Sequence, residues 1–209
     1  MALRNTIFAD YFYRILERSH IPRIKHSLLT PNQVTVLGLV LAVLVPIGFY
    51  VHPVWGLLIM IFSGCADAMD GLVAKKQGTH TVFGAFLDSS FDRISDFFYL
   101  FGFWVLCWNS DRIILVSGLI FLAFLFTFMI SYTKARVEGL GIICEKGLME
   151  RGLRTVYLIL WGLALCLFPP LFDPVLWFGL IVFCILTLFT AIQRIIHIRS
   201  EFAAQKSRS

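Results

Sequence analysis

Long runs of hydrophobic residues separated by short polar connections make up most of the chain between residues 32 and 198. An α-helix needs about 20 predominantly apolar residues to cross the hydrocarbon core of a bilayer. The pattern predicts six such helices, at residues 32–51, 53–76, 82–108, 112–138, 149–168 and 174–198. The second and third runs are less apolar than the others because they carry several aspartates. We therefore expect an all-α integral membrane protein with six transmembrane helices.

The first residues show a different pattern, in which apolar and polar positions recur at helical spacing. One face would carry Ile7, Phe8, Tyr11, Phe12, Ile15 and Leu16, and the other Thr6, Asp10, Arg14, Glu17 and Arg18. This predicts an N-terminal amphipathic helix at the membrane interface, with packing against protein as the alternative. We expect residues 1–28 to hold this helix and a connector, residues 29–199 the membrane domain, and residues 200–209 a polar tail.

The composition agrees with a membrane protein. Of the 209 residues, 58% are hydrophobic and only 15% are charged, and the mean hydropathy is +0.81. These values exclude an ordinary soluble globular domain. The five cysteines are scattered in or beside apolar stretches without a C-x-x-C pair, which is typical of small buried side chains.

The basic residues gather at alternate ends of the predicted helices. With the N-terminus in the cytoplasm, sixteen of the eighteen Lys and Arg residues fall at cytoplasmic ends. The exceptions are Arg112, on the outer side, and Arg93, within a helix. By the positive-inside rule, this predicts a multi-pass protein of the cell (cytoplasmic) membrane with both termini in the cytoplasm.

Residues 67–96 carry five of the thirteen acidic residues, although they lie between two hydrophobic stretches. Asp67 and Asp70 are three residues apart and Asp88 and Asp92 four apart, so each pair projects from one face of a helix. If the two helices form a hairpin near Thr79, both pairs lie at similar depth. Small residues beside them would let the helix backbones approach closely, so that the carboxylates converge.

Such a group of carboxylates needs compensation. Each costs roughly 2.5–3.5 kcal/mol in a membrane helix, and four would cost on the order of 10 kcal/mol. Carboxylates at close range must share protons, pair with Lys or Arg, or bind metal. Oxygen ligands favour Mg²⁺, Mn²⁺ or Ca²⁺ over zinc. The sequence therefore predicts a divalent-cation site near the cytoplasmic end of the helices.

The same residues resemble the signature of the CDP-alcohol phosphatidyltransferases, D-x-x-D-G-x-x-A-R, eight residues, then G-x-x-x-D-x-x-x-D. The matching positions are Asp67, Asp70, Gly71, Ala74, Gly84, Asp88 and Asp92. Lys75 stands where the family usually has Arg. The resemblance implies two divalent ions, Mg²⁺ or Mn²⁺, held by Asp67, Asp70, Asp88 and Asp92, with Asp92 also acting as the catalytic base.

The resemblance also implies where the CDP-linked donor lipid binds. The expected donor-binding residues are Pro31, Asn32, Asp67, Asp70, Gly71, Lys75 and Gly84. Thr30, Pro31 and Asn32 open the first predicted span, where free backbone N–H groups would point at the cytoplasmic rim. A simple helix cap is the alternative interpretation of these three residues.

Basic residues on the last three spans form the second candidate group. They are Lys134, Arg136, Arg151, Arg154 and Arg194. Lys134, Arg154 and Arg194 come from three different helices at about the depth of the aspartates, so they could bind an anionic group such as a phosphate. Ion pairing with spare carboxylates or with lipid phosphates is the alternative.

We compare three function classes with these features. An enzyme would transfer a phosphatidyl or archaetidyl group from CDP-diacylglycerol or CDP-archaeol to a phosphorylated alcohol and release CMP, as the resemblance implies. A divalent cation transporter would need a polar path through the outer halves of the helices, which the sequence lacks. A lipid-binding scaffold would not need four spaced carboxylates.

Further stretches point to the acceptor. F-G-A-F-L-D-S-S-F-D-R-I-S-D, S-Y-T-K-A-R-V-E-G-L-G and G-L-M-E-R resemble the branch of the family that makes phosphatidylinositol phosphate or its archaeal ether-lipid counterpart. This branch implies an inositol phosphate as acceptor, with glycerol 3-phosphate as the alternative. The family resemblance and the aromatic-rich third and fourth spans also lead us to expect a homodimer.

Overall fold

The computed structural model describes residues 30–77, 81–142, 144 and 147–206, without the side chains of residues 31, 70–77 and 204–206. The described residues form α-helices and one short 3₁₀ helix, and they contain no strand. This confirms the all-α prediction. The predicted N-terminal amphipathic helix lies outside the described residues.

Six long helices follow one another along the described part of the chain. They are α2 (Pro31–Val51), α3 (Pro53–Gln77), α4 (Val82–Leu106), α5 (Ile113–Glu138), α6 (Arg151–Leu167) and α7 (Phe172–Lys206), with the 3₁₀ helix η3 (Pro169–Leu171) before the last. The helices match the six apolar runs of the sequence, with ends that differ by at most a few residues except at the C-terminal end of α7.

Three of the helical segments are long and apolar enough to cross a membrane: Asn32–Val51, Ile113–Glu138 and Pro169–Ala203. The apolar part of α3 is shorter, Pro53–Met69, and α6 has only 17 residues. Helix α4 is long, but it carries three aspartates and one arginine. The charged residues of the candidate site are therefore what lowers the hydropathy of α4.

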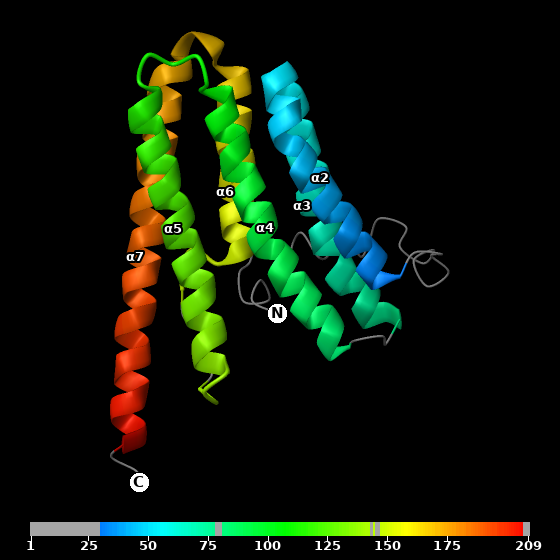
Figure 1. Ribbon diagram of the computed structural model, residues 1–209, viewed down its shortest axis with the longest axis vertical. Coiled ribbons are helices and arrows are strands. Elements are labelled where there is room, and N and C mark those ends of the chain that lie inside the picture. The colour runs from blue at the N-terminus through cyan, green and yellow to red at the C-terminus, as the bar shows by residue number, and fades with distance from the viewer. Residues whose placement is uncertain (1–29, 78–80, 143, 145–146, 207–209) are drawn as a thin grey trace.

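Successive helices run in opposite directions, so their connections gather at the two ends of the bundle (Figure 1). The α2–α3, α4–α5 and α6–α7 connections share the upper end in Figure 1. The C-terminal ends of α3 and α5 and the start of α4 lie at the lower end, toward which α7 also runs. Helix α6 starts set back from that lower end, above the ends of α4 and α5. The start of α6 therefore lies between the two ends of the bundle.

Side-chain caps define where two helices begin at the lower end. Thr30 and Gln33 form a reciprocal capping box at the start of α2, in which the backbone N–H of Thr30 donates to Oε1 of Gln33 at 2.8 Å. Thr81 caps α4, since its hydroxyl oxygen accepts from the backbone N–H of Gly84 at 2.9 Å. These caps therefore fix the first residues of α2 and α4, both of which start at the lower end of the bundle.

The opposite half of the bundle is an apolar core. The rings of Phe103 and Trp161 stack with centroids 4.1 Å apart, and Phe49 lies 5.3 Å from Phe103. Gly102 allows this packing, because a Cβ atom there would come within 2.8 Å of Phe49 and 2.9 Å of Val45. The described core in this half is therefore closely packed and built mainly from aromatic and aliphatic side chains.

A buried hydrogen-bond chain joins α2, α3 and α4 one helical turn from Asp67. The hydroxyl of Tyr99 donates to Oγ of Ser63 at 2.7 Å, and Ser63 donates to the carbonyl oxygen of Gly38 at 2.7 Å. A satisfied polar chain of this kind holds its helices in a specific arrangement. It therefore fixes the positions of these three helices close to the acidic residues.

Candidate active site

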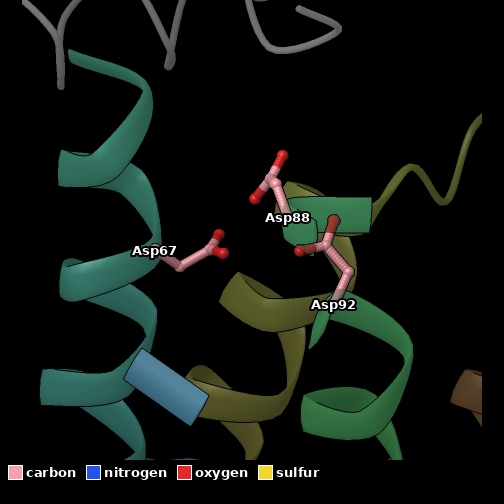
Figure 2. Close-up of side chains that lie close together, drawn as sticks. All are labelled: Asp67, Asp88 and Asp92. Carbon is pink, nitrogen blue, oxygen red and sulfur yellow. The ribbon is translucent and has the colours of Figure 1, made fainter. Parts of the chain in front are cut away.

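Three signature aspartates converge between α3 and α4. Asp67 extends from α3 toward Asp88 and Asp92 on α4 (Figure 2). One carboxylate oxygen from each of the three lies within 4.8 Å of the others. Asp88 and Asp92 share a face of α4 because they are four residues apart, and Asp67 meets them from the antiparallel neighbour. Three oxygens at this separation can act as ligands of one hard divalent cation.

The helix packing that brings the aspartates together differs from the packing that we expected from the sequence. We expected α3 and α4 to approach each other closely, yet over the described residues they scarcely touch, and α2 packs against both of them. Gly38 of α2 lies against Ala66, which precedes Asp67, and a Cβ atom on Gly38 would lie 3.4 Å from Cβ of Ala66. The carboxylates therefore approach one another from two helices that are held mainly by their packing on α2.

Arg151, the first residue of α6, lies among these carboxylates. Its Nη2 atom is 2.5 Å from Oδ1 of Asp67, and its Nη1 atom is 2.5 Å from Oδ1 of Asp92 and 4.0 Å from Oδ1 of Asp88. We expected Arg151 to bind an acceptor phosphate. In this structure its guanidinium pairs with Asp67 of α3 and Asp92 of α4, as in the ion-pairing alternative, and the prediction of phosphate binding stays a prediction.

Arg154 forms a second ion pair one turn deeper. Its Nη2 atom lies 2.8 Å from Oδ2 of Asp96, with side chains only 2% and 4% exposed. Nη1 of Arg154 donates to the carbonyl oxygen of Met149 at 3.0 Å, and Nη2 also approaches Oγ of Ser131 at 3.5 Å. The charge of Arg154 is thus matched inside the protein.

Arg194 supports the connection that leads into α6. Its Nη1 atom donates to the carbonyl oxygen of Ile130 at 2.6 Å, and its Nη2 atom lies 4.0 Å from Oε1 of Glu150. A Cβ atom on Gly147 would come within 2.7 Å of Nε of Arg194, so only glycine fits there without a shift. Arg194 and Arg154 therefore both contact the described part of the segment that precedes α6, at residues 147–150.

The remaining basic candidates lie nearer the surface. Nζ of Lys134 is 3.9 Å from Oε1 of Glu138 on the same face of α5, and its side chain is 33% exposed. Arg136 is exposed in the last turn of α5. Lys134 follows Ile130 and Ser131, which contact Arg194 and Arg154, by about one helical turn. The structure thus groups Lys134, Arg154 and Arg194 around one part of α5, with Arg136 apart from these contacts.

Two of the expected donor-binding residues lie side by side. A Cβ atom on Gly84 would come within 3.3 Å of Oδ1 of Asn32 and 3.0 Å of Oγ1 of Thr81, so the amide of Asn32 rests against the start of α4. Pro31 is the first residue of α2, and Asp70, Gly71 and Lys75 belong to the last turns of α3. The side chains of these four positions lie outside the described residues.

The carboxylates retain hydrogen-bonding capacity that suits a bound cation. Oδ1 of Asp92 is buried, and its close contact with Arg151 is not aligned as a hydrogen bond. Within the described part of the chain, neither this oxygen nor Nε of Arg151 has a hydrogen-bond partner. A buried carboxylate oxygen without a partner is costly, and coordination of a cation would relieve that cost.

Asp96 is the residue of this site for which we had expected no role from the sequence. A signal for it was present, because Asp88, Asp92 and Asp96 recur at intervals of four and so follow one face of α4. Asp92 pairs with Arg151 and Asp96 with Arg154, so two successive turns of α4 are linked to the first turn of α6. Glu150 and Ser131 were likewise not expected to contact the basic residues.

Comparison with known proteins agrees with this site. The family model for CDP-alcohol phosphatidyltransferase matches residues 28–193. An archaetidylinositol phosphate synthase from Methanothermobacter thermautotrophicus is 32% identical over 195 residues, which cover 93% of this chain and 95% of the relative.

Two crystal structures of phosphatidylinositol phosphate synthase from Mycobacterium tuberculosis share the fold. The structure with CDP-DAG bound has a TM-score of 0.70 and 28% identity, covering 90% of this chain and 92% of the other. The structure in complex with manganese and citrate has a TM-score of 0.70 and 30% identity, covering 81% and 82%.

A helical bundle with a carboxylate cluster at one end, carrying the D-x-x-D-G and G-x-x-x-D-x-x-x-D spacings, defines a class of metal-dependent lipid enzymes. The family match covers most of the chain and includes every signature aspartate. This protein belongs to the CDP-alcohol phosphatidyltransferase family.

Proposed function

We propose that this protein transfers a phosphatidyl or archaetidyl group from CDP-diacylglycerol or CDP-archaeol to the hydroxyl of an inositol phosphate, with release of CMP. The observation that carries the proposal is the convergence of Asp67, Asp88 and Asp92 within 4.8 Å, next to the arginines Arg151 and Arg154. The named relatives, which are phosphatidylinositol or archaetidylinositol phosphate synthases, support this choice of acceptor.

The donor is expected to bind where α2, α3 and α4 meet. Asn32 and Gly84 line the nucleotide side in this proposal, since the absence of a side chain at Gly84 leaves room beside the amide of Asn32. Pro31, Gly71 and Lys75 complete the donor site, together with Asp67 and Asp70. Lys75 supplies a positive charge to the diphosphate.

Asp67, Asp70, Asp88 and Asp92 hold the divalent ions, Mg²⁺ or Mn²⁺, in this proposal. When bound, the two ions neutralise the diphosphate and the leaving CMP. Asp92 takes the proton from the acceptor hydroxyl as its oxygen attacks the β-phosphorus of the donor. A new phosphate ester bond forms, the bond between the two phosphates breaks, and the electron pair of that bond leaves with CMP.

The acceptor phosphate is expected to bind on the basic side of the site. Lys134 and Arg151 are partly exposed and would contact it, with Arg136 as a further cation at the rim. Arg154 and Arg194 are almost fully buried, so they contribute positive charge from within and reach the phosphate only if their present contacts rearrange.

The membrane arrangement is part of the proposal. We propose that all six helices cross the cell membrane and that the lower end of the bundle in Figure 1 faces the cytoplasm. Helices α3, α4 and α6 would cross although they are shorter or carry charge, because those charges pair with one another inside the bundle. CMP would then be released into the cytoplasm.

A panel of acceptors tests the function. Purified protein would receive a CDP-linked lipid, Mn²⁺ and, in turn, inositol phosphate, glycerol 3-phosphate, inositol, glycerol and serine, with CMP release as the readout. We expect release with inositol phosphate and its loss when EDTA removes the metal. Release only with glycerol 3-phosphate would identify a phosphatidylglycerophosphate synthase instead. No release with any alcohol would contradict the enzymatic proposal and favour cation transport.

A further inference from the structure

Arg151 and a divalent cation would use the same oxygen atoms. The guanidinium nitrogens of Arg151 lie 2.5 Å from Oδ1 of Asp67 and 2.5 Å from Oδ1 of Asp92. Mg²⁺ binds carboxylate oxygens at about 2.0–2.1 Å and demands a nearly complete octahedral shell of oxygens. A guanidinium in contact with both carboxylates leaves no room for such a shell between them. Arg151 must therefore leave its present position before these oxygens can coordinate a cation.

The negative charges of the three aspartates favour the position of the Arg151 guanidinium among them. Asp67, Asp88 and Asp92 gather three carboxylates within 4.8 Å, and their mutual repulsion favours any cation among them. One guanidinium contacts two of them and approaches the third. The arginine stabilises the carboxylates in the metal-free protein, but a single positive charge compensates them only in part.

The neighbouring ion pair fixes the helix that carries Arg151. Arg154 is three residues further along α6, is 2% exposed, and contacts both Asp96 and the carbonyl oxygen of Met149. Breaking such a pair inside the protein would leave a buried charge without compensation. Helix α6 is thus anchored to α4 at Arg154, and the Arg151 side chain can move without displacement of the helix.

Arg151 also has an open side toward which it can move. Its side chain is 23% exposed, and its neighbour Asp88 is 47% exposed, in contrast to the enclosed Arg154. Nε of Arg151 has no hydrogen-bond partner among the described residues. Of the two arginine–aspartate links, the Arg151 contact is therefore the one open to solvent, and the Arg154 contact is the enclosed one.

We propose that Arg151 is a displaceable internal counter-ion: it occupies the cation site of the metal-free protein, and it turns outward to bind the acceptor phosphate when a divalent cation takes its place. This inference rests on the proposed function and adds an order to it. Cation binding frees the guanidinium, so the cation and the acceptor phosphate bind cooperatively. By thermodynamic reciprocity, the phosphate also strengthens cation binding by the same factor.

Binding measurements on the full chain in detergent, without any CDP-linked lipid, test the proposal. Free Mn²⁺ would be counted by electron paramagnetic resonance for wild type, Arg151→Gln and Arg151→Lys. Arg199→Gln, an exposed arginine on α7, serves as the matched control. We expect Arg151→Gln to bind Mn²⁺ roughly 5–150 times more tightly than wild type, the usual range of coupling between two sites. The control should match wild type.

The second measurement separates displacement from simple charge repulsion. Labelled inorganic phosphate, the group shared by both candidate acceptors, would be titrated with and without Mn²⁺. In wild type we expect Mn²⁺ to strengthen phosphate binding by roughly 5-fold or more. In Arg151→Gln this coupling should vanish. A coupling that arose only from direct attraction between Mn²⁺ and phosphate would persist in this variant. Persistence of the full coupling in Arg151→Gln would overturn the proposal.

Arg151→Lys keeps the charge but lacks the planar fork of the guanidinium, so it should hold the two carboxylates less well, bind Mn²⁺ more tightly than wild type and show weaker coupling. It also provides the test if Arg151→Gln does not fold. Wild-type Mn²⁺ affinity in both Arg151 variants would show that the arginine does not compete for the site. Because neither readout needs turnover, a failure of the acceptor panel and a failure of this proposal remain distinguishable.

Discussion

Asp92 lies at the centre of the acidic group, where it contacts Arg151 and carries a buried oxygen without a hydrogen-bond partner in the described part of the chain. We predict that Asp92→Asn, which preserves the shape of the side chain, lowers turnover by roughly 10²–10⁴, the range for loss of a general base. CMP release at saturating Mn²⁺ would measure it. Asp111→Asn, at an exposed carboxylate between α4 and α5, is the control. If Asp92→Asn kept most of the wild-type turnover, Asp92 would not be the general base.

Lys75 is the residue at which the sequence departs from the family signature. Arg would hold two phosphate oxygens in a planar fork, whereas Lys offers one mobile charge on a flexible stem. We predict that Lys75→Arg retains activity. Lys75→Ala should raise the KM for the CDP-linked lipid by the equivalent of about 1.5–3 kcal/mol, with Mn²⁺ affinity unchanged. Lys76→Ala is the neighbouring control, and unaltered kinetics in Lys75→Ala would leave only an anchoring role at the interface.

At the scale of helices, the pair Asp96 and Arg154 links α4 to α6. Arg154→Met would leave the carboxylate of Asp96 buried and unpaired, which costs about 3–5 kcal/mol. We predict that the double variant Asp96→Leu, Arg154→Met regains most of this stability, because it removes both buried charges. Thermal unfolding in detergent measures the difference, with Arg199→Met on the exposed face of α7 as control. Wild-type stability in Arg154→Met alone would show that the pair does not anchor α6.

The helices themselves follow from the sequence more completely than their contacts do. The apolar runs, bounded by Pro31, Pro53 and the polar connections, predicted most helix ends to within a few residues. The end of α7 is the main exception, since helix continues to Lys206 through residues interpreted as a polar tail. Helix propensity needs only local backbone hydrogen bonds, and a polar stretch can extend a helix that packing has already started.

The whole molecule carries a prediction about its orientation. The α3–α4 and α5–α6 connections should lie in the cytoplasm, together with the C-terminal end of α7. Green fluorescent protein fused after the last residue should therefore fluoresce, whereas alkaline phosphatase at the same place should be inactive. Truncation at Asp111, between α4 and α5, should reverse both results. An active phosphatase at the C-terminus would contradict the proposed topology.

We also predict a homodimer through α4 and α5. Exposed aromatic side chains follow these helices, among them Phe97, Phe101, Phe121 and Phe128. Phe97 and Phe101 stack on one another with centroids 5.9 Å apart. Contact with lipid would account for the same surface. Native mass spectrometry in mild detergent should show the dimer, and Phe121→Ala with Phe128→Ala should weaken it, while monomer alone in the wild type would rule it out.

The sequence alone determined the helical class, the six runs and the pairing of aspartates on two helix faces. It could do so because these features depend on local periodicity and on the energetic cost of charge in an apolar segment. The match of Asp67, Asp88 and Asp92 to a family signature also follows from spacing within one short stretch. The convergence of their oxygens agrees with that expectation.

Only the tertiary structure decided which basic side chain contacts which carboxylate. From the sequence, Arg154 and Arg194 were expected to bind the acceptor phosphate together with Lys134, and Arg151 to assist them. The packing places Arg151 among the signature carboxylates, Arg154 on Asp96, and Arg194 beside Glu150. The setback of α6 within the bundle brings two of these arginines to α4, and it depends on contacts between residues far apart in the chain. Spacing along the sequence carries no information about such distances, because they arise only when the helices pack.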